Sequence, residues 1–164
     1  MTKIGLISDT HGYLDESVFK HFDQSDEIWH AGDFGNIKLA ESLANFKPLK
    51  GVYGNIDGQD IRSVYPEHLK FTCEGMRVLM THIGGYPDKY DVKIRDEIYK
   101  NPPSLFICGH SHILKVIYDK KIACLHLNPG AAGKYGWHKA RTLLRFCISE
   151  EKIHSLEIIE LAGR

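Results

Sequence analysis

Three segments in the first third of the chain decide its fold: KIGLISDTHG at residues 3–12, EIWHAGDFGN at residues 27–36 and LKGVYGNID at residues 49–57. Each opens with a short apolar run that predicts a buried strand, and each ends in polar residues and glycine that predict a turn. Helices are predicted between them, at residues 15–22 and 36–46, with Asn36 capping the second and Pro48 ending it. Strand, helix, strand, helix, strand indicates a parallel sheet with right-handed crossovers.

The rest of the chain predicts a second sheet. Residues 67–73 and 76–81 flank a hairpin turn at Glu74-Gly75, and a helix at residues 89–100 is ended by Pro102-Pro103. Further strands are predicted at residues 105–108, 114–118, 122–127, 142–148 and 153–159. Because short turns join several of these strands, we expect a mostly antiparallel sheet. The predicted fold class is α/β, a two-sheet β sandwich flanked by helices, in a single domain spanning residues 1–164.

The composition excludes several classes of protein. Lys plus Arg and Asp plus Glu both total 21, so the formal net charge is zero and no broad cationic field is available for extended nucleic-acid or membrane binding. No run of about 18 apolar residues predicts a membrane span, and we expect a cytoplasmic protein. The four cysteines are widely spaced, which predicts reduced thiols rather than a thiolate zinc site. The oligomeric state stays open, and a homo-oligomer is compatible with the sequence.

Polar motifs follow the predicted strands where each strand ends. They are Asp9-Thr10-His11, Gly32-Asp33, Gly54-Asn55, Thr81-His82 and Gly109-His110-Ser111-His112. Open α/β sheets build their sites at such strand ends, so we expect these side chains to meet. Carboxylate, imidazole and amide donors without thiolate suit divalent ions such as Mn, Fe, Ni or Zn. Two such ions about 3.5 to 4 Å apart favour in-line displacement at phosphorus by a bridging hydroxide, so phosphoester hydrolysis is the predicted reaction.

The motif order D-x-H, G-D, G-N, H, G-H-x-H between Asp9 and His112 resembles the calcineurin-like metallophosphoesterase superfamily. Within it, the chain looks most like the small bacterial and archaeal phosphodiesterases, which are related to the retromer subunit that shares the fold. The resemblance implies a four-layer α/β/β/α architecture and two divalent ions, manganese first, with Ni, Zn, Fe or Mg also compatible. It implies that one ion is held by Asp9, His11 and His112, the other by Asn55, His82 and His110, and that Asp33 bridges them.

One position departs from the family pattern. Many larger members carry a histidine directly after the Gly-Asn motif, which protonates the leaving oxygen, whereas Ile56 stands here. A positioned general acid contributes about 10² to 10⁴ in rate. The site should therefore be slow on alkyl monoesters and better on aryl phosphodiesters. His138 or Asp57 could take over part of the task, and the expected catalytic residues are Asp33, Asn55 and His138.

Four further residues have two interpretations each. His30 and His126 either orient ligand residues or are plain core histidines, and Lys134 and Arg141 either offer positive charge to a substrate or have ordinary structural roles.

Three function hypotheses remain open at the sequence level. The first is a phosphodiesterase with two metal ions acting on a small phosphodiester. The second is a protein-binding scaffold that retains a weakly active metal site, and the third is a phosphomonoesterase or nucleotide hydrolase. Seven intact candidate ligands favour the first, and zero net charge argues against extended nucleic-acid contact.

Overall fold

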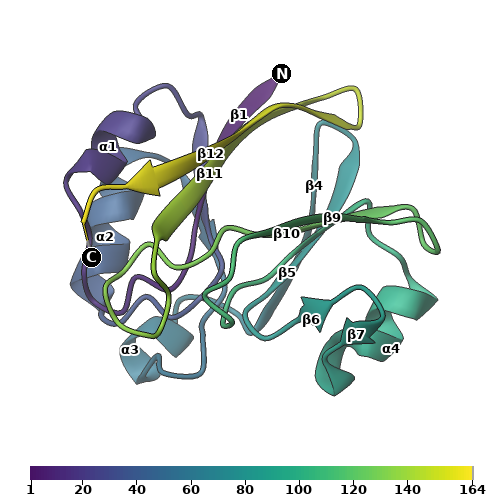
Figure 1. The fold of residues 1–164 in the computed structure, drawn as a ribbon, viewed down its shortest axis with the longest axis horizontal. Helices are drawn as coiled ribbons and strands as arrows, with labels where there is room; N and C mark the ends of the chain where they lie inside the picture. Colours follow the sequence, from purple (N-terminus) through teal and green to yellow (C-terminus); the bar gives the residue numbers. More distant parts are fainter. Residues whose placement is uncertain (164) are drawn as a thin grey trace.

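The computed structural model describes residues 1–163 and shows two five-stranded sheets packed as a sandwich with helices outside, as the sequence predicts. The first sheet has the order β12-β11-β1-β2-β3. Its strands are β1 (Thr2–Ile7), β2 (Glu27–His30), β3 (Leu49–Gly51), β11 (Arg141–Ser149) and β12 (Lys152–Leu161). Figure 1 shows this sheet on the left and the second sheet on the right.

The second sheet has the order β4-β5-β8-β10-β9. Its strands are β4 (His68–Cys73), β5 (Met76–Thr81), β8 (Leu105–Ile107), β9 (Lys115–Asp119) and β10 (Cys124–Asn128). A two-stranded hairpin, β6 (Gly85–Tyr86) and β7 (Lys89–Tyr90), stands apart from both sheets. The helices are α1 (Ser17–His21), α2 (Ile37–Phe46), α3 (Gln59–Arg62) and α4 (Val92–Lys100).

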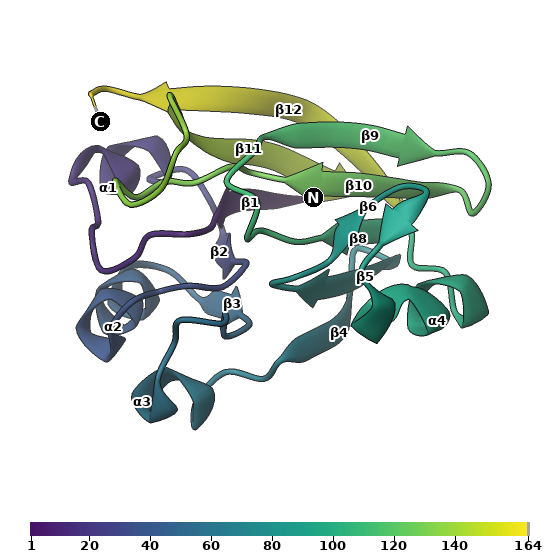
Figure 2. The same ribbon diagram turned by 60° about the horizontal axis from the view of Figure 1, so that its bottom comes forward.

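Apolar side chains fill three layers between these elements. Leu6, Trp29, Val78 and Leu105 belong to the core between the two sheets. A second cluster packs α1 and α2 on the outer face of the first sheet, and a third packs α4 on the outer face of the second sheet. Figure 2 shows the same separation, with α1 and α2 at one end and α4 at the other. The order is therefore helices, sheet, sheet, helix.

The prediction of a mostly antiparallel second sheet is wrong. β4 and β5 pair antiparallel, as do β9 and β10, but β5, β8 and β10 run parallel. Parallel neighbours need a crossover, and α4 supplies it between β5 and β8. The last two strands leave this sheet altogether, because β11 pairs antiparallel with β1 and β12 follows as the edge. Short apolar runs do not reveal which sheet they join.

Several boundaries also differ from the sequence predictions. The last helix begins at Val92 rather than at residue 89, because Asp91 accepts a hydrogen bond from the Lys93 amide while the residues before it form the β6–β7 hairpin. The short helix α3 was not predicted, since Gly58 and only four residues give no helical period. Asn36 caps α2 as expected, accepting from the Leu39 amide at 2.9 Å.

Two other expectations concern the chain as a whole. All four cysteines are free, with Cys108 and Cys124 buried and Cys73 and Cys147 half-buried. Among the helices of residues 1–163, none has the length and apolar character that a membrane span requires.

Candidate metal centre

Five loops at the carboxyl ends of parallel strands carry the candidate ligands. Asp9 and His11 follow β1, Asp33 follows β2 and Asn55 comes after β3, all from the first sheet. His82 follows β5, and the remaining two histidines, His110 and His112, follow β8, so these three come from the second sheet. The site is therefore assembled across the contact between the two sheets, and neither sheet contains it alone.

Most of these ligand positions have an unusual backbone. Asp9, His11, Asp33, His110 and His112 have φ values between 46° and 69°. This left-handed region is uncommon for residues other than glycine and costs of order 1–3 kcal/mol at each position. The loops turn sharply here, so that consecutive side chains can reach one small volume.

The glycines before the ligands leave room for side chains from other loops. A Cβ on Gly54 would collide with the carboxylate of Asp33, and a Cβ on Gly109 would collide with the hydroxyl of Ser8 and approach the carboxylate of Asp9. The Gly-Asn and Gly-His motifs are thus packing requirements of the site as well as turns.

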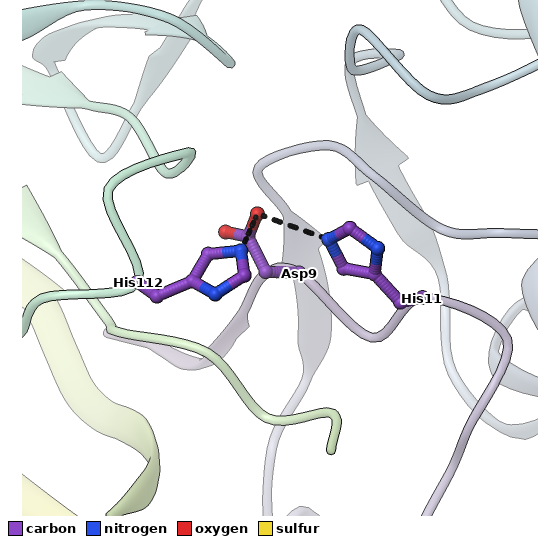
Figure 3. A group of neighbouring side chains, drawn as sticks. All are labelled: Asp9, His11 and His112. Atoms are coloured by element: carbon purple, nitrogen blue, oxygen red, sulfur yellow. Dashed lines mark ion pairs between the residues drawn. The ribbon is translucent and has the colours of Figure 1, made fainter. Parts of the chain in front are cut away.

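The histidine and aspartate ligands form two groups, and within each group the donor atoms lie within 4.8 Å of one another. The first ligand group is Asp9, His11 and His112, drawn in Figure 3. His112 Nε2 lies 3.1 Å and His11 Nε2 3.8 Å from Asp9 Oδ1. The second ligand group is Asp33, His82 and His110, with His82 Nε2 at 3.1 Å from Asp33 Oδ2.

The two groups share their carboxylates. Asp33 Oδ2 also lies 3.3 Å from His11 Nε2 in the first group, and Asp9 Oδ1 lies 3.8 Å from His82 Nε2 in the second. The two carboxylates and the two imidazoles therefore surround one compact volume. This arrangement is consistent with a dinuclear site.

Three of these atoms are buried without a hydrogen-bond partner: Asp9 Oδ1, His11 Nε2 and His82 Nε2. A buried polar atom left unpaired costs roughly 1–3 kcal/mol, and proteins rarely retain several in one place without a function. All three point into the volume between the two groups. Divalent ions would satisfy each of them, so the residues present fit a metal centre.

The electrostatics of the centre favour cations. Burial alone would raise the pKa of Asp9 and Asp33, but the facing imidazoles hold both pKa values far below the usual range. Asp33 and Asp9 in turn raise the pKa of His11 to about 9. Positive charge is therefore held where the two ions would lie.

Residues 2–151 match the family described as the calcineurin-like phosphoesterase superfamily domain. The chain belongs to this superfamily.

Individual relatives agree with this assignment. A probable metallophosphoesterase of Methanothermobacter thermautotrophicus is 30% identical over 135 residues, which cover 78% of this chain and 76% of the relative. The structure of an archaeal phosphodiesterase is 18% identical, covers 97% of this chain and 99% of its own, and superposes with a TM-score of 0.75. Vps29 from Entamoeba histolytica, solved in complex with zinc, is 14% identical, covers 97% and 98%, and gives a TM-score of 0.71. The chain therefore lies in the small phosphoesterase branch, structurally close to Vps29.

Hydrogen bonds behind the metal-facing atoms fix the ligands of this phosphoesterase. The second nitrogen of His82, Nδ1, donates to the Ala31 carbonyl at 2.7 Å. Ser8 donates to Asp9 Oδ2 at 2.6 Å, and the His110 amide donates to the same oxygen at 3.1 Å. Such contacts set the orientation and basicity of ligands. The sequence analysis did not single out Ser8, although its place next to Asp9 is a signal.

His30 ties the two aspartate loops together. Its Nδ1 accepts from the Gly32 amide at 3.1 Å, which leaves Nε2 protonated to donate to Thr10 Oγ1 at 3.0 Å. The Thr10 hydroxyl in turn donates a hydrogen bond to the Phe34 carbonyl at 2.9 Å. Burial lowers the pKa of His30 to about 3, so this histidine is neutral. Of the two interpretations left open, His30 takes the supporting role.

His126 takes the other interpretation. It is fully buried and stacks on Phe106, and its Nε2 lies 3.9 Å from the Cys108 sulfur. Burial lowers its pKa to about 4. It is a core histidine of the second sheet.

Asn128, the last residue of β10, supports the ligand loop after β8. Its Nδ2 donates to the Gly109 carbonyl at 3.0 Å and to Ser111 Oγ at 3.1 Å, and its Oδ1 accepts from the Gly130 amide. It thus holds the segment that carries His110 and His112.

Asn55 lies beside the second ligand group, with Oδ1 3.0 Å from His110 Nδ1. Ile56, the next residue, is 46% exposed and offers no proton. Asp57 is buried, and its carboxylate accepts from the amides of Phe34, Gly35 and Gly54. The hypothesis that Asp57 protonates the leaving group therefore fails, because its oxygens are committed to backbone donors.

His138 contacts the side of His112 that faces away from Asp9. Its Nε2 lies 2.8 Å from the Gly133 carbonyl, and its Nδ1 lies 3.3 Å from His112 Nδ1. With Nε2–H donating to the carbonyl, Nδ1 accepts from His112, whose Nε2 then faces Asp9 Oδ1. These contacts favour a positioning role over the acid role predicted from sequence.

The two candidate cations both contact other parts of the protein. Arg141 is fully buried and binds Asp15 and the carbonyls of Ala132 and Gly163. Lys134 lies over the ring of Tyr13 at 4.4 Å. The interpretation of Arg141 as a substrate ligand is therefore wrong.

Two clefts flank the ligand groups. The polar cleft, of about 280 Å³, adjoins Asn55 and His82 and has both charge signs on its walls: Arg62, Glu67, Asp91 and Lys93. The aromatic cleft, of about 630 Å³, adjoins the histidines of the loop after β8. Its walls include His110, His112, Ile113, Tyr135, Trp137 and His138. Both clefts therefore border residues of the centre.

Proposed function

We propose that this protein is a metal-dependent phosphodiesterase that hydrolyses a small phosphodiester. The observation that carries the proposal is the convergence of two ligand groups between two clefts. A phosphodiester has two organic substituents on one phosphate, and a cleft lies on each side of the groups to receive them. A monoester would use only one of these clefts.

Divalent ions bound by the two groups would supply Lewis-acid activation of the phosphate and of an attacking water molecule. Residues of the protein would position the ions and the phosphate. Asp33 lies between His11 and His82 and would hold the two groups in register. Asn55 and the exposed His110 would leave the outer face open for phosphate oxygens.

The leaving group is expected to need little protonation. No proton donor follows Asn55, and the carboxylate of Asp57 is engaged by backbone amides. A site without a general acid loses about 10² to 10⁴ in rate on poor leaving groups. Aryl phosphodiesters should therefore be turned over much faster than alkyl monoesters.

Manganese is the ion that we propose. The donors are oxygen and nitrogen, and the nearby Cys108 stays a thiol because burial raises its pKa to about 12. The same ligands accept Ni, Zn, Fe or Mg, so activity with several ions is expected.

The test measures hydrolysis of bis(4-nitrophenyl) phosphate and 4-nitrophenyl phosphate by protein stripped of metal and resupplied with Mn²⁺. Asp33→Asn and His82→Ala are measured beside it, with Asp88→Asn at an exposed ion pair as the matched control. The proposal predicts metal-dependent diester activity that Asp33→Asn and His82→Ala abolish while the melting temperature persists. If neither ester is turned over with metal bound, a scaffold function replaces the enzyme.

A further inference from the structure

The aromatic cleft exposes apolar side chains directly beside the metal ligands. The Trp137 side chain is fully exposed, and Tyr135 and Ile113 are 71% and 57% exposed. Aromatic surface left in water at a site opening is a common mark of ligand binding. The polar cleft has charged walls instead.

The loop that carries Tyr135 and Trp137 packs against two of the metal ligands. Tyr135 stacks on the imidazole of His11, with centroids 5.1 Å apart and planes at 24°. A Cβ on Gly136 would collide with the His112 ring, so the backbone presses closely against that ligand. His138 then contacts His112 from the next turn of the loop. The loop thus holds Tyr135 against His11 and places Trp137 two residues further along, on the wall of the same cleft.

We propose that Tyr135 and Trp137 form a specificity subsite that stacks a planar aromatic substituent of the phosphodiester substrate. This inference rests on the proposed function, because a phosphate at the centre brings its substituent into the aromatic cleft. Of the described residues on the cleft walls, none is Asp, Glu, Lys or Arg. The walls therefore suit a neutral ring system.

The size of the cleft agrees with such an occupant. Its volume of about 630 Å³ lies within the range of sites for small organic ligands. The two ligand histidines on its wall make it continuous with the reaction site, which favours part of the substrate over a separate protein partner. Stacking on an aromatic side chain recognises the flat face of a ring without selecting one base, so several aromatic substituents should bind.

The test compares two probes that differ by one aromatic ring system. Adenosine 5′-monophosphate and ribose 5-phosphate both present a phosphate monoester on a ribose, but only the first has a base. Binding to the Mn²⁺-loaded protein is followed by tryptophan fluorescence. Trp29 is fully buried and Trp137 fully exposed, so quenching by the ligand reports on Trp137.

We expect adenosine 5′-monophosphate to bind at least about 5-fold more tightly than ribose 5-phosphate and to quench Trp137. Tyr135→Ala should remove most of the difference in affinity. Trp137→Ala, measured by calorimetry, should do the same, and Trp137→Phe should restore it. Ile158→Ala, an exposed apolar position on β12, is the control and should change neither affinity.

A kinetic measurement gives a second criterion. Trp137→Ala should raise KM for bis(4-nitrophenyl) phosphate by about 5-fold or more and leave kcat within about 2-fold, because stacking binds the substrate without entering the chemistry. A fall in kcat at constant KM would contradict the subsite.

The outcomes separate this inference from the proposed function. Equal binding of the two probes, with metal-dependent diesterase activity intact, overturns the aromatic subsite and keeps the enzyme. Tighter binding of the base-containing probe without any hydrolysis keeps the subsite and overturns the phosphodiesterase. If Trp137→Ala changes the oligomeric state but leaves probe binding unchanged, Trp137 and Tyr135 form a contact between copies of the chain. That outcome also overturns the subsite.

Discussion

The two ligand groups are made of the same residue types but differ in how firmly the protein holds them. In the first group, Asp9 is fully buried, His11 is covered by Tyr135 and His112 is backed by His138. In the second group, Asp33 and His82 are buried, but His110 is exposed, and its ring contacts His82 and the exposed Asn55.

Because of this difference, we expect the two groups to bind their ions with different affinities. Ligands that are fixed before binding lose less entropy, so the first group should hold its ion more tightly. The more open second group should exchange its ion more easily and should offer positions to phosphate oxygens. Substitutions in each group test whether the two groups differ in this way.

The largest effect is expected from Asp9→Asn. Asp9 faces His112 and His11 in the first group, and its other oxygen accepts the amide of His110 in the second. Loss of its charge should lower kcat/KM on bis(4-nitrophenyl) phosphate by at least about 10³-fold, since metal activation supplies several kcal/mol. Metal content, measured by mass spectrometry, should fall as well. Retention of two ions with full activity would refute the shared role of this carboxylate.

Removing one histidine from each group compares the groups directly. His112→Ala should weaken the tighter metal-binding step by on the order of 10²-fold, whereas His110→Ala should weaken the other step by on the order of 10-fold, because the exposed imidazole is less preorganised. Titration of metal-free protein with Mn²⁺ by calorimetry resolves the two steps. A larger loss of metal affinity in His110→Ala than in His112→Ala would show that the first group is not the more firmly held one.

His138→Ala tests the support of the first group. Loss of the contact with His112 Nδ1 should lower metal affinity by about 10- to 100-fold, and saturating Mn²⁺ should restore most of kcat. An exposed histidine, His154, provides the control as His154→Ala. If His138 were instead the general acid, the rate deficit would persist at saturating metal and one limb of the pH profile would disappear.

The smallest effect concerns the two buried histidines that do not bind metal. Burial lowers the pKa of His126 to about 4 from 6.5, so the folded protein resists the proton that the unfolded chain accepts. Stability from this residue is complete above pH 6.5 and is lost as the pH falls toward 4, by about 2 kcal/mol at pH 5. Urea unfolding of the metal-free protein measures this loss. In His126→Leu the free energy of unfolding should fall less between pH 6.5 and pH 5 than in the wild type.

Metal binding should distinguish His126→Leu from His30→Leu. His126→Leu should leave metal content unchanged, because its ring contacts only core groups. His30→Leu should lose metal affinity together with the acid sensitivity, since His30 joins the loops of Asp9 and Asp33 through Thr10 and Gly32. Equal metal affinities in the two variants would show that the His30 contacts do not matter to the site.

Much of the architecture was predictable because its signals are local. The apolar runs before Asp9, Asp33 and Asn55 predicted three strands, and Asn36 and Pro48 bounded the helix between two of them. The partners of β8 and β11 were not predictable in this way. A short apolar run fits any buried strand position, and the choice of sheet depends on contacts distant in sequence.

The motifs in a fixed order were enough to predict the family and the donor types, and the apolar runs were enough to predict most of the strands, but not how those strands pair. How the donors are used depends on the three-dimensional fold. It turned Asp57 toward backbone amides, placed His138 behind His112, buried Arg141 in a structural role and opened a different cleft on each side. The physical reason is that side-chain direction and burial depend on loops from two sheets meeting at one edge, and no local pattern encodes that meeting.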